Sequence, residues 1–284
     1  MVRLDAPSRV HTGTQRIYLH HNLWSKHDFA GGNGGECIAT WGMFMRAEHN
    51  LFEDCNGDPE IVTLKSSDVV FRYNTLRRST KGMLTLRYSN RSVIEGNFFF
   101  GLRGGIRAYG ADHKIINNYF QDNNGTAIFV SHGQGTNYLQ INKMLIAHNT
   151  MVNDAISPRG GETPPINVTI ANNLIRKDGG SAINAGADWQ ATYQGNIIWG
   201  SATTNIPAAG YKKVDPLLMV GGGVSHLGAG SPAIDAAMGS FGIMDDMDGH
   251  PRMGTPDVGA DEYSTAAPLR RPLTAADVGP MAGL

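Results

Sequence analysis

An asparagine followed by two mostly apolar residues recurs along the chain at nearly constant spacing. Successive copies lie 28, 24, 23, 21, 31, 24 and 23 residues apart. A period near 23 residues is too short for the usual helical repeats and is typical of solenoids built from short strands. The copies begin at Asn22, Asn50, Asn74, Asn97, Asn118, Asn149, Asn173 and Asn196.

Short β-rich runs lie between these asparagines and are bounded by turn residues. Asparagine suits the bends because it tolerates a left-handed backbone, and equivalent side-chain amides could bond to one another along the stack. We read the two long intervals as loop insertions. The sequence therefore predicts an all-β, right-handed parallel β-helix with roughly 23 residues per rung. The runs are 69–73, 92–95, 114–116, 144–147 and 168–171.

The repeat pattern ends near Val214. We expect residues 1–263 to form the β-helix, with an irregular last rung or polar cap from about residue 214, because an end rung would otherwise expose its core. The remaining residues, 264–284, are rich in Pro and Ala and are expected to wrap the outside or fray.

Composition excludes several classes of protein. The net charge of −1 gives no overall field for nucleic acid or an anionic membrane. No apolar run has the length of a membrane span, and no signal peptide is visible at the start of the chain. With only Cys37 and Cys55 a disulfide framework is excluded, and spacing alone does not decide whether one bridge forms.

Two outward positions carry basic residues on successive rungs. Alternation along two strand-like runs places aliphatic residues inward and Lys65 and Arg87 outward. These two residues are 22 positions apart, about one rung, so their side chains are expected to share one site. Continuing by one rung at a time brings Arg107 and then Phe129 into the same column. We predict a basic stripe that ends in an aromatic ring able to stack on a sugar.

Oxygen-bearing side chains precede this stripe. Asp58 and Glu60 stand at the bend before the Lys65 run, and Asn33 lies about one rung earlier. Amide and carboxylate oxygens together are the hard ligands that suit Ca²⁺. The acids could equally serve as balancing partners for the basic column, since stacked like charges repel. The residues alone leave both interpretations open.

At these positions the sequence resembles polysaccharide lyase family six, which contains alginate lyases and chondroitinase B. The resemblance implies a right-handed parallel β-helix, with Lys65 on the family's catalytic base and Arg87 on its catalytic acid. It places Asn33, Asp58 and Glu60 on the family's calcium ligands. The matching segments are 33–36, 50–62, 65–66, 72–75, 84–87, 104–107, 117–120 and 270–280.

The chain departs from the family pattern in two residues and in length. Asp58 stands where the family usually has Glu, which bears on metal affinity, and Tyr88 stands where it usually has His, which bears on sugar preference or rate. The chain also begins late relative to the family. A short natural form and a shortened chain both fit this late start.

The resemblance implies β-elimination at a uronic acid. Calcium would neutralise the carboxylate, Lys65 would take the C5 proton, and Arg87 would protonate or stabilise the leaving O4. Arg107 and His113 would hold a neighbouring carboxylate, with Tyr88 and Phe129 as further substrate contacts. The expected partner is an anionic polysaccharide, with alginate before dermatan-type glycosaminoglycan, and the expected location is secreted or periplasmic.

Two rival functions are compatible with a β-helix. A hydrolase would need paired carboxylates flanking the bond, whereas the predicted column here is basic. A non-catalytic carbohydrate-binding or structural β-helix would bind without cleaving. The sequence does not decide between mannuronate and guluronate, between endo and exo action, or which oligomeric state forms.

Overall fold

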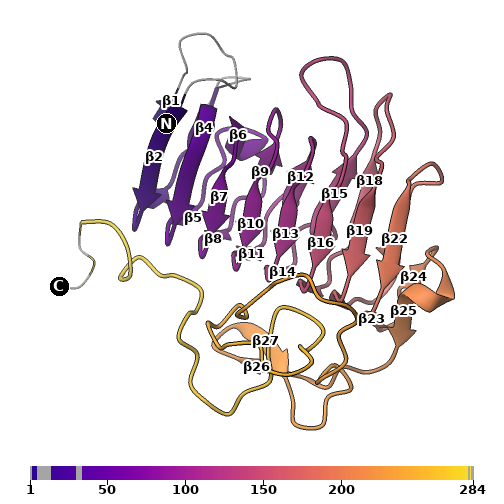
Figure 1. The fold of residues 1–284 in the computed structure, drawn as a ribbon. Helices are drawn as coiled ribbons and strands as arrows, with labels where there is room; N and C mark the ends of the chain where they lie inside the picture. Colours follow the sequence, from indigo (N-terminus) through magenta and orange to yellow (C-terminus); the bar gives the residue numbers. More distant parts are fainter. Residues whose placement is uncertain (1, 5–13, 30–33, 281, 283–284) are drawn as a thin grey trace.

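The computed structural model describes residues 2–4, 14–29, 34–280 and 282. It is a right-handed parallel β-helix of about eight turns, with a C-terminal segment running along one side (Figure 1). Each complete rung contributes one strand to each of three faces, as β6 (Glu60–Ser67), β7 (Val70–Arg72) and β8 (Thr75–Arg77) do. The predicted fold is therefore confirmed.

The first and second faces are continuous through β4 (Ile38–Glu48), whose first half pairs with β6 and whose second half pairs with β7. Besides β6, the first face contains β1 (Val2–Leu4), β9 (Met83–Leu86), β12 (Ile106–Ala108), β15 (Ile128–Ser131), β18 (Ile156–Arg159), β21 (Ser181–Ile183) and β24 (Thr203–Thr204). Besides β7, the second contains β2 (Thr14–His20), β10 (Val93–Glu95), β13 (Lys114–Ile116), β16 (Leu145–Ala147), β19 (Val168–Ala171) and β22 (Ala191–Gln194).

The third face is a separate sheet of nine parallel strands. The last rung is completed by a short 3-10 helix, η1 (Ala208–Gly210), which leads into the final strand of this face. The strands are β3 (Leu23–Ser25), β5 (Leu51–Glu53), β8, β11 (Phe98–Phe100), β14 (Tyr119–Gln121), β17 (Thr150–Val152), β20 (Leu174–Arg176), β23 (Asn196–Trp199) and β25 (Tyr211–Lys213).

The repeated asparagines form a continuous hydrogen-bonded ladder between the second and third faces. Each side-chain amide donates to the side-chain oxygen of the asparagine one rung on, over 2.8 to 3.0 Å, from Asn22 to Asn196. Each residue before a ladder asparagine has a positive φ, for example His49 at 54° and Gly96 at 60°. The left-handed residue turns the chain, and the asparagine then satisfies main-chain groups that the bend removes from the sheets.

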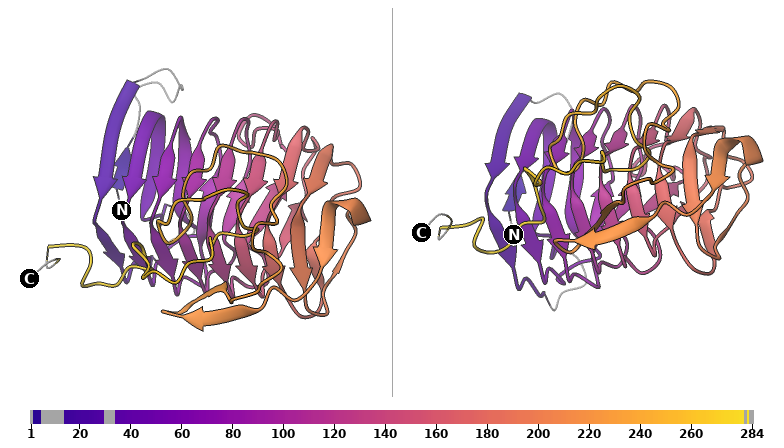
Figure 2. Two further views of the ribbon diagram at one scale, coloured as in Figure 1. Left: turned by 60° about the horizontal axis from the view of Figure 1, so that its bottom comes forward. Right: turned by 90° about the horizontal axis from the view of Figure 1, so that it is seen from below.

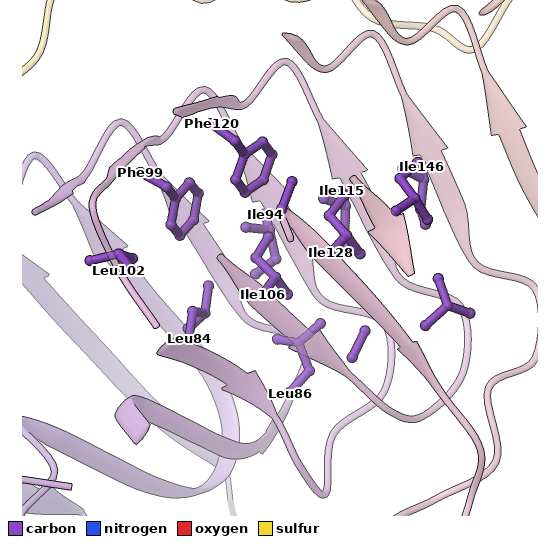
Figure 3. Close-up of a cluster of buried hydrophobic side chains, with 14 of the residues drawn as sticks. Leu84, Leu86, Ile94, Phe99, Leu102, Ile106, Ile115, Phe120, Ile128 and Ile146 are labelled. Carbon is purple, nitrogen blue, oxygen red and sulfur yellow. The ribbon is translucent and has the colours of Figure 1, made fainter. Parts of the chain in front are cut away.

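The interior is a column of aliphatic and aromatic side chains, one layer per rung. Along β6 and β9 the aliphatic residues point inward, as alternation predicts, and are fully buried. Phe99 and Phe120 stack with ring centroids 4.7 Å apart. Burial of each such side chain contributes about 2 kcal/mol, so stacking of rungs stabilises the fold. Figure 3 shows Leu84, Leu86, Ile94, Phe99, Leu102, Ile106, Ile115, Phe120, Ile128 and Ile146 in this column.

The chain after residue 213 does not add an irregular last rung or cap, which corrects the prediction. It forms an antiparallel hairpin, β26 (Leu218–Gly221) and β27 (Val224–Leu227), and further loops that pack on the third face (Figure 2). Val224 and Met247 cover Phe98 and Tyr119, because the outward side chains of that face are apolar there.

The tail returns toward the first rungs. The amide of Leu273 donates to Thr75 Oγ1 over 2.8 Å, and the amide of Gly279 donates to the carbonyl of His21 over 2.7 Å. Through residue 279 the tail is thus held against the outside of the stack. In the part of the chain that the structure describes, no helix has the length and apolar character needed to cross a membrane.

Candidate active site

Lys65 and Arg87 lie on the outer surface of the first face, on successive rungs. Leu64 and Leu86 are in register and buried, so the residues that follow them point outward. The amide of Arg87 donates to the carbonyl of Leu64 over 3.0 Å, which holds the two rungs together beyond the last paired residues. This arrangement agrees with the 22-residue offset in the sequence.

An aromatic residue stands one rung before Lys65. Trp41 of β4 is in register with Lys65, and Lys65 Nζ lies 5.2 Å from the centre of the Trp41 ring. Tyr88 packs beside the same tryptophan, with ring centroids 6.0 Å apart. Trp41 was not among the site residues predicted from the sequence, although its position 24 residues before Lys65 is about one rung and marks it as a neighbour.

Arg107 does not continue the Lys65–Arg87 column, which corrects the predicted stripe. It is in register with Thr85, two residues before Arg87, so Tyr109 stands where Arg107 was expected. The step from β9 to β12 is 22 residues, not 20. Phe129 is in register with Arg107, so these two residues form a second column beside the first.

Arg107 forms an ion pair with Glu60, one of the predicted metal ligands. The side chains are 11% and 7% exposed, so the pair is largely removed from water. Glu60 also accepts a hydrogen bond from the Thr63 hydroxyl. A register irregularity between Glu60 and Val62 turns the carboxylate out of the interior, which explains how an acid can share the sequence parity of buried leucines.

Asp58 joins two neighbouring loops. One carboxylate oxygen accepts from the amide of Gly34 over 3.2 Å and the other accepts from the amide of Glu60 over 3.0 Å. The loops are in backbone contact, because a Cβ placed on Gly35 would lie 2.3 Å from the carbonyl oxygen of Gly57. The third predicted ligand, Asn33, lies outside the described residues.

Tyr138 belongs to the loop that follows β15 (Figure 1), and its ring packs against two arginines of the site. The centre of the Tyr138 ring lies 4.9 Å from Arg87 Cζ and 5.9 Å from Arg107 Cζ, within the range of cation–π attraction. Tyr109 packs against the same ring, at 4.8 Å between centroids. The long 31-residue interval in the repeat showed that a loop exists here, and only the fold shows where its tyrosine goes.

His113 cannot contact substrate, which corrects its predicted role. It is fully buried, and its Nε2 lies 3.1 Å from the carbonyl oxygen of Ser89 and 2.9 Å from that of Tyr109. Its Nδ1 accepts from the amide of Ser92 over 3.1 Å. Burial lowers the pKa of His113 to about 4, so the ring is neutral at pH 7 and ties turns together.

Phe129 is partly buried on the first face beyond Arg107. Arg159 of the next rung lies over its ring, with Cζ 5.8 Å from the ring centre. The ring covers Gly104, where an added Cβ would lie 2.8 Å from it. Phe129 therefore stands at the edge of the same surface, and its predicted contact with sugar stays a prediction.

The C-terminal segment contains acidic clusters that the sequence analysis did not single out. His226, Asp248 and Asp261 converge beside a cavity of about 470 Å³, on the side of the molecule that carries the third face. Asp246 accepts from the amides of Asp248, His250 and Glu262, so its carboxylate organises the loop. These hydrogen bonds give the buried carboxylate of Asp246 a structural role.

The sequence and the fold of this chain were compared with those of known proteins. The family model Chondroitinase B matches residues 11–222. A search of curated proteins found none that matches the chain. The solved structure of the PL6 family alginate lyase AlyGC is 30% identical, with a TM-score of 0.69, and the likeness covers 80% of this chain and 35% of AlyGC.

Two further structures share the fold. A mannuronic acid specific polysaccharide family 6 lyase from human gut microbiota is 25% identical over 78% of this chain and 56% of its own, with a TM-score of 0.62. The PL6 family polysaccharide lyase Pedsa3628 from Pseudopedobacter saltans, 20% identical over 94% of this chain and 64% of its own, has a TM-score of 0.57 and supports the fold alone. Because the family model covers most of the described β-helix, the chain belongs to polysaccharide lyase family 6, the family of chondroitinase B and AlyGC.

Proposed function

We propose that the chain acts as a polysaccharide lyase on a uronate-containing polymer, with alginate as the first substrate to test. The observation that carries the proposal is the outward pair Lys65 and Arg87 on adjacent rungs, beside the buried acids Asp58 and Glu60. Family membership and the likeness to AlyGC, described as an alginate lyase, support the same reaction. Since the chain spans 35% of AlyGC, the activity of the longer protein is a proposal for this chain.

In this proposal Lys65 is the base. Its neutral amine takes the C5 proton of the uronate, the electron pair left on C5 forms the C4–C5 double bond, and the bond from C4 to the glycosidic oxygen breaks. Arg87, one rung on, donates a hydrogen bond to the departing oxygen. Because a guanidinium holds its proton tightly, water oriented by Arg87 supplies the proton that the oxygen gains, and the hydroxide left behind takes the proton that Lys65 removed from C5. Trp41 covers one side of Lys65 and limits the positions its amine can take.

Substrate contacts follow from the surface around this pair. Tyr88, Arg107 and Phe129 are partly exposed on the first face and are proposed to contact neighbouring sugar units. Arg107 has a second task, because it already pairs with Glu60 and so positions that acid. Tyr138 holds the guanidinium of Arg87 against the stack.

The donor set fits a calcium ion. Asp58 and Glu60 are buried carboxylates two residues apart, and Arg107 forms its ion pair with Glu60. With Asn33 they would offer oxygen ligands of the kind that Ca²⁺ prefers. A bound ion would stabilise negative charge on the uronate carboxylate as the C5 proton leaves. Asp58 is shorter than the Glu usual in the family, so we expect weaker metal binding than a Glu would give.

Two alternatives have specific support. The matching family model is named for chondroitinase B, so dermatan sulfate is the second substrate to test. The chain spans only part of AlyGC, so a binding module that needs further residues for cleavage is the non-catalytic alternative. For any such polymer we propose a secreted or periplasmic location, because a long anionic polysaccharide does not cross the cytoplasmic membrane unaided.

The test incubates the purified chain with alginate, polymannuronate, polyguluronate and dermatan sulfate, and follows the ultraviolet absorbance of the unsaturated uronate that elimination creates. Lys65→Ala should lose at least about 100-fold in rate, as expected for a general base. Lys114→Ala, which removes an exposed lysine from the second face, is the matched control and should keep full activity. Absence of absorbance with all four polymers, together with retained binding, would favour the non-catalytic alternative.

A further inference from the structure

We propose that Cys37 and Cys55 are a cross-linking site, at which a disulfide closes one turn of the β-helix next to the candidate active site. Their sulfur atoms lie 2.8 Å apart, and both residues are 2% exposed. A disulfide bond is about 2.05 Å long, so closure needs a movement of less than about 1 Å. The cross-link itself does not depend on the proposed lyase function.

The two cysteines stand at opposite ends of one rung. Cys37 immediately precedes β4 and Cys55 follows β5, so the bridge would join the start of this rung to its end, 18 positions later. Both main chains are already held by the following rungs. The amide of Cys37 donates to the carbonyl of Ile61 over 2.8 Å, and the amide of Cys55 donates to Ser79 Oγ over 2.9 Å. The fold thus brings the thiols together before any bond forms.

The chemistry needs an oxidant, which we take to be a small disulfide such as oxidised glutathione. One cysteine thiolate attacks a sulfur of the oxidant, whose own disulfide breaks and releases one thiol. The second cysteine then attacks the mixed disulfide and releases the other. Two protons and two electrons pass from the cysteines to the two glutathione thiols. The hydrogen bond with Cys37 and burial raise the pKa of the Cys55 thiol, so oxidation should be much faster during folding than in the folded chain.

The cross-link would restrain the loops that carry the acidic residues of the site. Gly34 donates to Asp58, and Gly35 touches Gly57, in the two segments next to the cysteines. A bridge here would hold those segments together when the turn loosens. This consequence for the site rests on the proposed function, whereas the bridge and its effect on thermal stability do not.

Peptide mass analysis of the unmodified chain tests the bridge directly. The chain is refolded with oxidised glutathione or with a reductant, denatured, treated with an alkylating agent and cut with trypsin. Cleavage after Lys26, Arg46 and Lys65 separates the cysteines onto peptides 27–46 and 47–65. The oxidised sample should give one joined species, two hydrogen atoms lighter than the sum of the peptides. Two alkylated peptides, or two peptides each carrying glutathione, would overturn the proposal.

Thermal melting gives an independent readout. Oxidised chain should melt higher than reduced chain by on the order of 5 °C, since the bridge restricts the unfolded state. Cys55→Ser and Cys37→Ser should each abolish the difference between oxidising and reducing conditions, whatever their own melting temperatures. A difference that persists in both variants would mean that the bridge is not its cause. Because neither readout uses a polysaccharide, failure of the lyase assay leaves both unaffected.

Discussion

Arg107 and Glu60 form an ion pair across 47 positions of sequence, on two rungs that are separated by a third. Glu60 begins β6 and Arg107 lies in β12, with β9 between them. The guanidinium spans that rung over Thr85, with which it is in register. The pair thus ties the base of the candidate metal site to the surface proposed to bind substrate.

Loss of either partner of this pair should destabilise the chain. Arg107→Gln or Glu60→Gln leaves one buried charge without its partner, which costs about 3 kcal/mol or more. The double variant should be less destabilised than the sum of the two, because neither charge remains. Urea unfolding of the four proteins measures this coupling. Arg91→Gln, which breaks an exposed pair with Asp68, should cost under about 1 kcal/mol.

Calcium affinity should respond in opposite directions to two substitutions at the site. Asp58→Asn removes a ligand charge and should weaken binding, whereas Arg107→Gln removes a nearby positive charge and should strengthen binding about tenfold. Calorimetric titration with calcium measures both without any substrate. Asp261→Asn, in the C-terminal segment, should leave this affinity unchanged. If both site variants bind like the unmodified chain, the ion is held elsewhere.

Tyr138 should matter for turnover through its ring and not through its hydroxyl. Tyr138→Ala frees the Arg87 guanidinium and should lower kcat/KM about tenfold, or about 1.4 kcal/mol, which lies within the range of one cation–π contact. Tyr138→Phe keeps the ring and should retain near-normal kinetics. Tyr263→Ala, on the C-terminal segment, is the control. Equal losses in the Phe and Ala variants would assign the effect to the hydroxyl.

The asparagine ladder should be most sensitive in its middle. Asn97 accepts two bonds from Asn74 and donates to the carbonyl of Phe71 and to Asn118. Asn97→Ala leaves these groups buried without partners and should cost about 3 kcal/mol or more. Asn22 stands at the exposed end, so Asn22→Ala should cost under half as much. Comparison of melting temperatures tests the difference, and equal losses would show that burial of the ladder amide does not set the cost of its removal.

His113 should make stability fall as the pH is lowered. The unfolded ring protonates near pH 6.5, whereas burial lowers the folded pKa to about 4, so the unfolded state binds more protons in this window. From pH 7 to pH 5 the loss from this residue is about 2 kcal/mol. His113→Gln should remove that part of the slope. Burial also raises the pKa of Asp154 to about 6, which opposes the trend, so the variant is compared at each pH.

The periodic part of this protein follows from the order of its residues alone. A rung has a nearly constant length because a fixed number of residues is needed to go once around the core, so the spacing of asparagines predicts both the ladder and the adjacency of Lys65 and Arg87. Side-chain alternation then predicts which of these residues face outward. The family resemblance adds chemistry to positions that the repeat had already brought together.

Contacts between distant segments become visible only in the folded chain. A two-residue error in rung length moved Arg107 from one column to the next, because register is discrete and follows the turns. His113 is buried because a turn closes over it, Tyr138 reaches Arg87 because its loop folds back, and the chain from residue 214 covers the third face instead of the stack's end. None of these contacts repeats along the chain, so no period in the sequence could have shown them.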